Sequence, residues 1–371
     1  MSVSIRGLFV VAFFIFSNGA FAQLGGSSTY AFLDLVQSAR VAGLGGYQTA
    51  VKDGDINLVG QNPALLDTSM HQHLTTNFTN YYAGINYGHV AFANRFRKVG
   101  MLNFAIQYVG YGSFDQADVA GNVTGTFNAN ETAFNVAWSR QLNRFFHIGV
   151  NAKAIYSQLA SYNSFGMAAD LGLLFHNPKT NWSIGLVMNN AGGQIKAYNG
   201  SNREPLPVKL HLTVSHRLKY VPLRLSMTVR DLQRPDLTFD DPTNSGPSVD
   251  PLTGEEVEDT YTFGDGADAV MRHIVFSGEV YIAKIITASI AYNYGRRQEL
   301  KVASKPGTIG LSWGLGIRLN RFHISYARAT YHQAGGTNHI SIRTHLGKHI
   351  KRARKPKKVK KLKVKSVEQD G

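Results

Sequence analysis

One pentapeptide in this chain has the spacing of a catalytic motif. The residues from Gly310 to Gly314 match the G-x-S-x-G pattern, in which a sharp turn from a strand into a helix exposes a nucleophilic serine, here Ser312. Around it, however, apolar residues at 309, 311, 313, 315 and 317 alternate with glycine or serine. This alternation predicts one continuous strand rather than a turn. We therefore interpret the glycines as making room for a plug inside the protein.

Two further groups of residues have types that bind metals. His71 and His73 would share one face of a strand, but two histidines without an acidic partner are a weak zinc signal, and we expect a solvated strand start. The segment from Asp231 to Asp268 contains eleven acids and one base, Arg234. It lacks the D-x-[DN]-x-[DN]-G spacing of a calcium loop. We expect a solvated surface loop or a landing site for a basic partner, with these candidate residues: Asp236, Asp240, Asp241, Glu255, Glu256, Glu258 and Asp259.

No other group of residues suggests catalysis. The sequence has no cysteine, which excludes disulfides and thiolate chemistry. It also contains no recognisable acid–base pair or nucleophile constellation. We therefore expect a protein that is not an enzyme and that has no cofactor and no metal site.

The elements that must carry these residues repeat fourteen times between His71 and Leu346. Each unit has roughly ten alternating apolar and polar residues, followed by a connection. Odd-numbered connections are mostly long and polar, whereas even-numbered ones are mostly tight turns, as in outer-membrane β-barrels. The predicted strands lie near 72–80, 83–93, 99–111, 130–141, 144–158, 164–176, 181–191, 207–218, 221–232, 270–283, 285–297, 307–319, 321–331 and 336–346.

The distribution of aromatic residues favours a membrane barrel over a soluble sandwich. The even connections twice contain the sequence Leu-Asn-Arg-Phe, at 142–145 and 319–322. Two aromatic belts, one at each end of the strands, are typical of bilayer interfaces. The opposite strand ends are rich in tyrosine, at Tyr81, Tyr82, Tyr108, Tyr111, Tyr156, Tyr294 and Tyr331.

Four segments follow along the chain. Residues 1–22 have the positive, apolar and small-residue regions of a secretory signal peptide. Residues 23–70 are glycine-rich without a strand period and predict a plug. The barrel occupies 71–347, and 348–371 form a basic tail with eleven cationic and two acidic residues. This tail carries +9 of the net charge of +15, so the charge does not indicate nucleic-acid binding by the barrel.

These segments predict an all-β, 14-stranded antiparallel transmembrane barrel in the outer membrane. Large loops near 112–129, 191–206 and 233–269 would be outside, and the tail would lie in the periplasm, where it binds lipid phosphates or an acidic partner or stays solvated. Charged or polar residues expected in the lumen either line a permeation path or hold the plug. They are Lys153, His211, Arg224, Arg230, Glu279, Arg318 and Arg343.

The segment from Ser38 to Leu66 resembles the N-terminal hatch of FadL-like outer-membrane proteins. It contains S-A-R-V-A-G-L-G-G and the N-P-A signature at Asn62-Pro63-Ala64, both of which precede a fourteen-stranded barrel in that family. The resemblance implies that this segment is a hatch inside the barrel.

A narrower resemblance, over about 29–346, is to the PorQ family of the type IX secretion system of Bacteroidetes. It rests on the segments Thr29–Leu35, Tyr111–Phe114, Asn190–Gln194 and Glu204–Pro207. The resemblance implies a non-enzymatic barrel that anchors a PorZ-like surface protein. That protein works with a sortase, PorU, and its carrier barrel, PorV, which attach secreted cargo to lipopolysaccharide.

The alternative is a FadL-type transporter, in which the hatch around Asn62-Pro63-Ala64 moves to admit a hydrophobic molecule. Such a protein needs an apolar pocket beside the hatch, which the glycine-rich strand near 307–319 would border. The fold alone does not decide between the two functions.

Overall fold

The computed structural model describes most of the barrel and the segment before it. The expected signal peptide at 1–22 and the basic tail at 348–371 lie outside the described residues. The described ranges are 28–200, 202–238, 248–249, 256–257, 263–283, 285–300, 308–332 and 335–347.

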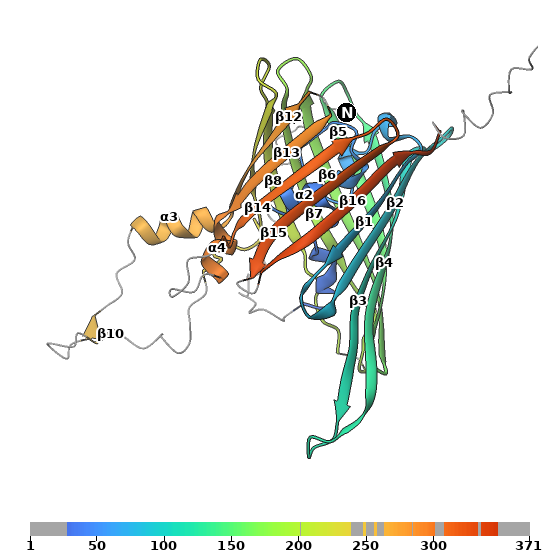
Figure 1. Cartoon of the computed structure of the whole chain (residues 1–371), viewed down its shortest axis with the longest axis vertical. Coiled ribbons are helices and arrows are strands. Elements are labelled where there is room, and N and C mark those ends of the chain that lie inside the picture. The colour runs from blue at the N-terminus through green and yellow to red at the C-terminus, as the bar shows by residue number, and fades with distance from the viewer. Residues whose placement is uncertain are drawn as a thin grey trace, which may run out of the picture.

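Fourteen antiparallel strands close into one barrel, each paired with its neighbours along the chain, and the first strand pairs with the last (Figure 1). The prediction of a 14-stranded antiparallel barrel is therefore confirmed, and each strand overlaps a predicted one. The bounds are β1 His73–Asn80, β2 Asn86–Phe96, β3 Gly100–Ala117, β4 Val123–Gln141, β5 Phe146–Leu159, β6 Tyr162–Asn177, β7 Trp182–Lys196, β8 Lys209–Arg217, β9 Leu223–Val229, β12 Ile274–Ile282, β13 Ile286–Asn293, β14 Leu311–Arg318, β15 Phe322–His332 and β16 Gly335–His345.

The barrel wall is apolar outside and polar inside. In β9, Leu225 is 51% exposed, whereas its neighbours Arg224 and Ser226 are 7% and 8% exposed. The same alternation continues round the barrel, with buried asparagine, serine, threonine and histidine facing inward. A soluble sheet would bury its apolar face instead, so this inverted polarity fits a wall surrounded by lipid.

The even connections are uniformly short, whereas the odd ones vary. The even connections, such as 97–99 and 319–321, have three to five residues, while the odd ones range from the short turn 160–161 to the long segments 197–208 and 230–273. The prediction that odd connections are mostly long is therefore wrong: it holds for three of the seven, 197–208, 230–273 and 294–310. We call the two ends of the barrel the even end and the odd end. At the odd end lie α3 (Phe263–Arg272), α4 (Tyr294–Leu300) and the two-stranded sheet of β10 (Ser248–Val249) and β11 (Glu256–Val257).

The predicted loop at 112–129 is wrong in its extent. Residues 112–117 extend β3 and residues 123–129 extend β4, so the two strands form a hairpin that projects beyond the rest of the barrel (Figure 1). The pairing shifts register between Gly110 and Ser113, where Gly112 has a φ of 84°. Glycine tolerates this left-handed conformation, and the resulting bulge lets the ladder continue past the irregular residues.

The predicted strand starting near 307 and the loop starting at 191 also need correction. Strand β14 begins at Leu311, and Ile309 is buried before it, 2% exposed. Strand β7 continues to Lys196. Both differences arise at strand ends, where the apolar period of the sequence gives no sharp boundary.

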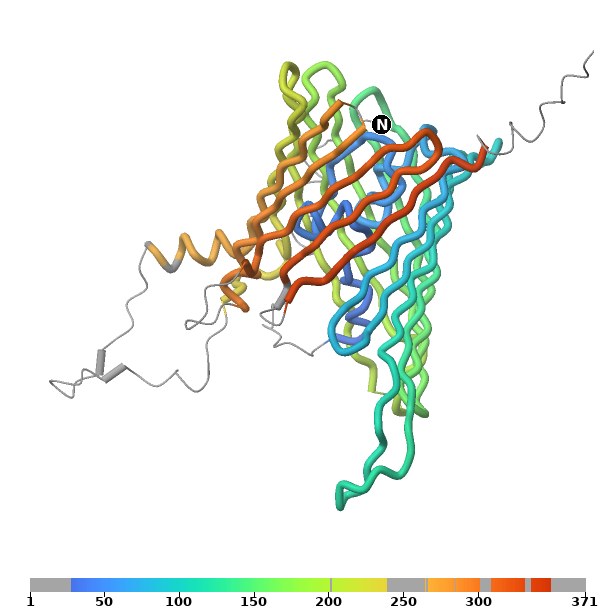
Figure 2. The backbone as a smooth tube through the Cα atoms, in the orientation of Figure 1, coloured from blue at the N-terminus to red at the C-terminus, as the bar shows by residue number. Residues whose placement is uncertain are grey.

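Residues 28–70, which we call the hatch, fill the lumen. They contain one helix, α2 (Ala39–Gly43), and the short 3-10 helices η1 (Ala31–Asp34), η2 (Ile56–Leu58), η3 (Pro63–Leu65) and η4 (Thr68–Met70). The blue trace in Figure 2 passes through the barrel. It starts near the odd end, where the Thr29 amide donates to Pro205, and ends at Gln72, beside β2 and β16. None of the helices within the described residues has the length and apolar character needed to cross a bilayer.

Candidate functional site

The Asn62-Pro63-Ala64 signature forms a tight turn inside the barrel. Asn62 caps the short helix η3, because its side-chain oxygen accepts a hydrogen bond from the Ala64 amide at 2.9 Å. Its side-chain nitrogen donates to the Thr49 carbonyl at 2.8 Å. Pro63 occupies the first helical position, where its fixed φ suits the turn and no amide hydrogen is needed. The signature therefore fixes two parts of the hatch to each other.

Glycines in the wall allow the hatch backbone to approach closely. A methyl group on Gly149 of β5 would lie 2.3 Å from the Pro63 carbonyl carbon, and one on Gly172 of β6 would lie 2.0 Å from the Asn62 side-chain oxygen. On β7, a methyl on Gly185 would lie 2.1 Å from the Thr49 carbonyl oxygen. Three successive strands thus carry glycine where the hatch touches them.

A similar contact explains the glycine-rich motif around Ser312. Gly43 of α2 packs against Gly314 of β14, with 3.0 Å between a Cβ added to Gly43 and the Gly314 Cα. Gly314 therefore makes room for the hatch, as the sequence predicted, whereas a methyl group on Gly316 would meet His323 and Ser325 of β15. Ser312 is 3% exposed and is the second residue of β14, which continues to Arg318, so the strand-to-helix turn of a nucleophile elbow is not formed here.

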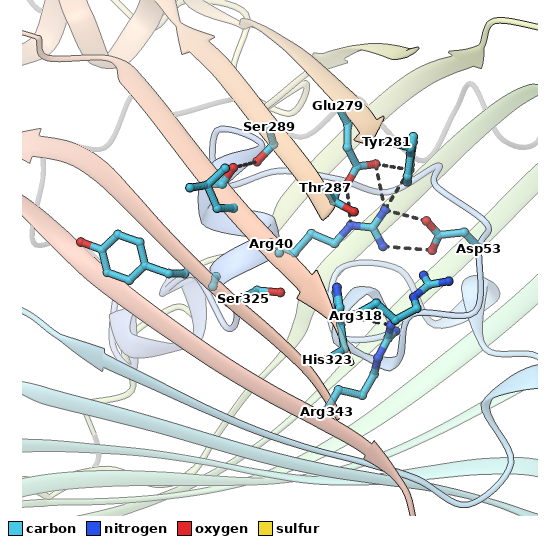
Figure 3. Close-up of a pocket in the computed structure, with 15 residues that line it drawn as sticks. Arg40, Asp53, Glu279, Tyr281, Thr287, Ser289, Arg318, His323, Ser325 and Arg343 are labelled. Atoms are coloured by element: carbon cyan, nitrogen blue, oxygen red, sulfur yellow. Dashed lines mark hydrogen bonds and ion pairs between the residues drawn. The ribbon is translucent and has the colours of Figure 1, made fainter. Parts of the chain in front are cut away.

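Arg40 of α2 is the centre of a charged cluster between the hatch and the wall (Figure 3). Its guanidinium pairs with Glu279 of β12 at 2.8 Å and with Asp53 and Asp55 of the hatch at 2.6 and 2.9 Å. The Tyr281 hydroxyl donates to Glu279 as well. Because arginine has five donors in a planar fork, one side chain can hold three carboxylates.

Two arginines of the wall complete this cluster. Arg224 of β9 pairs with Asp53 and Glu279, both at 3.1 Å, and Arg343 of β16 pairs with Asp55 at 2.7 Å. Burial would raise the pKa of Asp53, but the Arg40 and Arg224 guanidinium groups outweigh it and hold this pKa below its usual value. For Asp55, Arg343 and Arg40 likewise overcome the effect of burial and lower the pKa. Both carboxylates therefore remain charged at neutral pH.

A second charged cluster lies nearer the odd end. Lys153 of β5 pairs with Asp170 of β6 at 2.9 Å and donates to the Asn190 side chain at 2.6 Å. Asn190 has a φ of 60° at a register shift of β7 and donates to Asp34 of the hatch at 3.2 Å. Asp34 also pairs with Lys209 of β8 at 2.9 Å. This cluster is another link between hatch and wall.

The odd end of the hatch is held by hydroxyl and aromatic contacts. The Tyr30 and Ser164 hydroxyls lie 2.5 Å apart, and the Tyr30 ring lies 6.4 Å from that of Tyr198. Tyr111 donates to Glu131 at 2.5 Å. Tyr111 and Tyr81 pack against a buried cluster around Tyr30, so the expected tyrosine belt is partly an inward-facing group. Tyr108 and Tyr156 do face outward, 48% and 42% exposed.

Two of the cavities inside the barrel are lined largely by polar or charged residues. One borders β14 and is lined by Arg40, Asp53, Glu279, Arg318 and Arg343 among others (Figure 3). The other is lined by amide side chains, namely Gln37, Asn103, Gln107, Asn135 and Asn151, together with His89. The expectation that the glycine-rich strand borders an apolar pocket is therefore wrong for the cavity beside β14.

The residues expected in the lumen fall into four groups. Arg224, Glu279 and Arg343 belong to the Arg40 cluster, and Lys153 to the second one. Arg230 pairs with Asp231 and Glu299 near the odd end, where His211 accepts a hydrogen bond from the Asp231 amide. Arg318 lines the cavity beside β14 but has no ion pair within the described residues.

The other candidate residues are not brought together. His71 accepts from the Arg95 amide, whereas the His73 ring lies 5.1 Å from that of His345. In the part of the chain that the structure describes, no group of three potential metal ligands occurs. Asp236 accepts from the Thr238 amide, and Glu256 lies in β11. Asp240, Asp241, Glu255, Glu258 and Asp259 lie outside the described residues.

The sequence analysis missed Arg40, Asp53 and Asp55 as members of a site. Asp53 and Asp55 follow Arg40 by 13 and 15 residues in the hatch, while its partner Glu279 follows it by more than 200 residues. The only available signal was an Asp-Gly-Asp turn following an arginine in a segment that had to sit inside a charged lumen.

The even end carries a collar of exposed cations. The even connections contain no acidic residue. The exposed cations in and beside them, among the described residues, include Arg95, Arg97, Lys98, Arg140, Arg144, Lys179, Arg217, Lys219 and Arg318. Some of these cations lie over aromatic rings, as with Arg144 over Phe145, 5.7 Å from the ring centre.

A closed fourteen-stranded barrel with a hatch in its lumen defines the fold of FadL-like outer-membrane proteins. No protein-family model matches the chain, and no curated protein sequence matches it. Among solved structures, the Ralstonia pickettii toluene transporter TbuX matches with a TM-score of 0.50 and 11% identity, over 84% of this chain and 99% of that one. This likeness shows the fold.

Two further structures match less well. The Pseudomonas putida toluene transporter TodX has a TM-score of 0.46 and 12% identity, over 84% of this chain and 97% of that one. A Pseudomonas aeruginosa FadL homologue has a TM-score of 0.43 and 10% identity, over 83% and 98% of the two chains.

Proposed function

We propose that this chain is an outer-membrane barrel whose hatch stays in the lumen and whose odd end anchors a surface protein. The observation that carries this proposal is the attachment of the hatch. Ion pairs join it to β8, β9, β12 and β16, through Lys209, Arg224, Glu279 and Arg343. Breaking one such buried pair leaves an uncompensated charge and costs about 3–5 kcal/mol, so movement of the whole hatch is strongly disfavoured.

The odd end offers the surface for a partner. The β3–β4 hairpin projects from the barrel, and the long connection between β9 and β12 carries the exposed Asp236 near its start. On the sequence resemblance, we further propose that the partner is a PorZ-like protein of the type IX secretion system, which works with the sortase PorU and the barrel PorV. Lipids of the outer membrane would surround the wall, and the even end would face the periplasm.

Transport of small apolar molecules is the second candidate, and similarity of fold favours it. TbuX, which has the same fold, is a toluene transporter. For this chain, transport requires the hatch to leave or tilt. The polar cavity beside β14 does not suit an apolar solute, but it would be remodelled if Arg40 moved.

An engineered disulfide between hatch and wall separates the two candidates. The Thr49 and Thr213 hydroxyl oxygens are 2.8 Å apart, one in the hatch and the other in β8, and the sequence contains no cysteine. Replacing both by cysteine would lock the hatch. A matched control replaces Ser215 and Ser226, which are 2.9 Å apart and both in the wall.

The measurements are toluene uptake by cells and pull-down of surface proteins from native membranes in gentle detergent. If the protein is an anchor, the oxidised T49C/T213C variant retains its surface partner, and toluene uptake is the same with and without the disulfide. For a transporter, uptake is lost in the oxidised T49C/T213C variant and returns on reduction, while the S215C/S226C control transports normally. Loss of uptake in the oxidised variant, together with the absence of any co-purified surface protein, would contradict the anchor function.

A further inference from the structure

A cationic cavity opens at the even end of the lumen. It lies between the hatch turn at Asp53 and Gly54 and the ends of β14, β15 and β16. Its lining includes Arg318, Arg321 and Arg343, together with His73, His323 and His345. Figure 3 shows Arg318, His323 and Arg343 together near Asp53, at the border with the cavity beside β14.

The charges around this cavity do not balance. The Arg40 cluster has three cations and three anions, which pair with one another: Arg40, Arg224 and Arg343 with Asp53, Asp55 and Glu279. Arg318 and Arg321 add two positive charges, and neither forms an ion pair within the described ranges. Asp53 is the one acid in the lining, and Arg40 and Arg224 already neutralise it.

The position of Arg318 suits ligand binding. It follows the inward-facing residues Ser312, Gly314 and Gly316 in the alternation of β14, so its side chain belongs to the lumen face, yet it is exposed to solvent. Arginine presents a planar fork of donors that matches the oxygens of a phosphate group. A structural arginine in a lumen would instead be paired, as Arg224 and Arg343 are.

We propose that this cavity binds a phosphate group, held mainly by Arg318 and Arg321, either as free phosphate or as the headgroup of a lipid at the even end. The site is independent of the proposed function, because it requires neither a moving hatch nor a surface partner. The excess of two positive charges matches a phosphate monoester at neutral pH, and the neighbouring histidines and Ser69 can add donors.

The test is calorimetric titration of the full chain in detergent with sodium phosphate, at an ionic strength kept constant with chloride. Short-chain phosphatidic acid is titrated in parallel. The wild type is expected to bind both, and tighter binding of phosphatidic acid would identify the lipid headgroup as the source. Arg318→Gln is expected to weaken binding tenfold or more, about the effect of losing one charge-assisted hydrogen bond.

The control is Arg144→Gln, which removes an exposed cation from the even end without touching the cavity. Its affinity should equal that of the wild type. Equal losses in the two variants would mean diffuse attraction to a basic surface, and no binding by the wild type would overturn the site outright. Because Arg318 lies at a strand end, the variant is checked for folding by the shift of the unheated barrel on a denaturing gel.

Discussion

Arg40 shows how a single side chain can attach the hatch to the barrel. Its guanidinium contacts two carboxylates of the hatch and one of the wall, and it is itself mostly buried, with 11% of its side chain exposed. In the lumen, each of these charges is stable because the others are present. The cluster is therefore a unit, and removing Arg40 leaves its three carboxylate partners with fewer positive charges.

Arg40→Ala is accordingly expected to destabilise the docked hatch by about 3–5 kcal/mol, since it leaves Asp55 and Glu279 buried with fewer partners. Limited proteolysis in detergent would measure this effect, as faster cleavage within residues 28–70 while the barrel stays resistant. Arg144→Ala, an exposed residue of an even connection, should change the rate little. Equal rates for Arg40→Ala and the wild type would show that the cluster does not hold the hatch.

The same cluster predicts how docking depends on pH. The pKa values of Asp53 and Asp55 are held below the usual value near 4 by the neighbouring arginines, after allowance for burial. Charged carboxylates therefore stabilise docking at every pH above about 4, and this contribution is lost as the pH falls through the lowered pKa values. A spin label at Ser69→Cys should stay immobile from pH 7 to pH 4 and gain mobility only at lower pH. Release between pH 5 and 6 would contradict this assignment.

Wall glycines should be sensitive wherever the hatch touches them. Gly172→Ala places a methyl group 2.0 Å from the Asn62 side-chain oxygen, so the hatch must shift, at a cost of about 1–3 kcal/mol. Gly88→Ala on β2 is the matched control, because a methyl there meets nothing within 4 Å. Thermal unfolding followed by protease accessibility of the hatch should separate the two, and equal behaviour would mean that the hatch adapts without strain.

At the level of residues, the sequence predicted the inward direction of the charged side chains better than their partners. Alternation along a strand decides which face Arg224 or Glu279 occupies, and this is a local property. The partners Asp53 and Asp55 lie in the irregular hatch, where no repeating pattern of apolar and polar residues shows which way a side chain points. Their positions depend on how the hatch folds within the finished barrel, which is a long-range property.

At the level of elements, the strands were predictable because each has an apolar face of sufficient length to meet lipid. The hairpin at 112–129 was not, because beyond the membrane both faces of a strand meet water and the apolar alternation disappears. There Phe114 stacks on Phe127, 5.4 Å apart, and backbone pairing continues across a polar sequence. The barrel already aligns β3 and β4, so their backbone pairing extends into the hairpin even though the sequence there has no alternation of apolar and polar residues.

The long connection between β9 and β12 is expected to be dispensable for folding. The two strands pair directly from Val229 with Ile274 to Leu223 with Val280, so the barrel closes whatever joins them. Replacing residues 239–262 by a short Gly-Ser linker should leave the heat-induced gel shift unchanged and, if the partner docks on this acidic segment, release it in the pull-down. A retained partner would move the docking site to the β3–β4 hairpin.

At the level of the whole molecule, charge is distributed unevenly along the barrel axis. The even end has a collar of cations and connections free of acids, while the acidic segment 231–268 belongs to the odd end. This polarity was predictable from the sequence once the connections were assigned alternately to two ends. Because the turns of such barrels are short on the periplasmic side, we propose that the even end faces the periplasm.

Orientation in the membrane is open to a direct test because the chain has no cysteine. Ala120→Cys lies at the tip of the β3–β4 hairpin, and Lys179→Cys lies in the even connection between β6 and β7; both positions are exposed. In intact cells, a membrane-impermeant maleimide should label Ala120→Cys, and it should reach Lys179→Cys only after the outer membrane is permeabilised. Labelling of Lys179→Cys alone in intact cells would reverse the orientation. The projecting hairpin would then face the periplasm, and a surface partner could not dock on it.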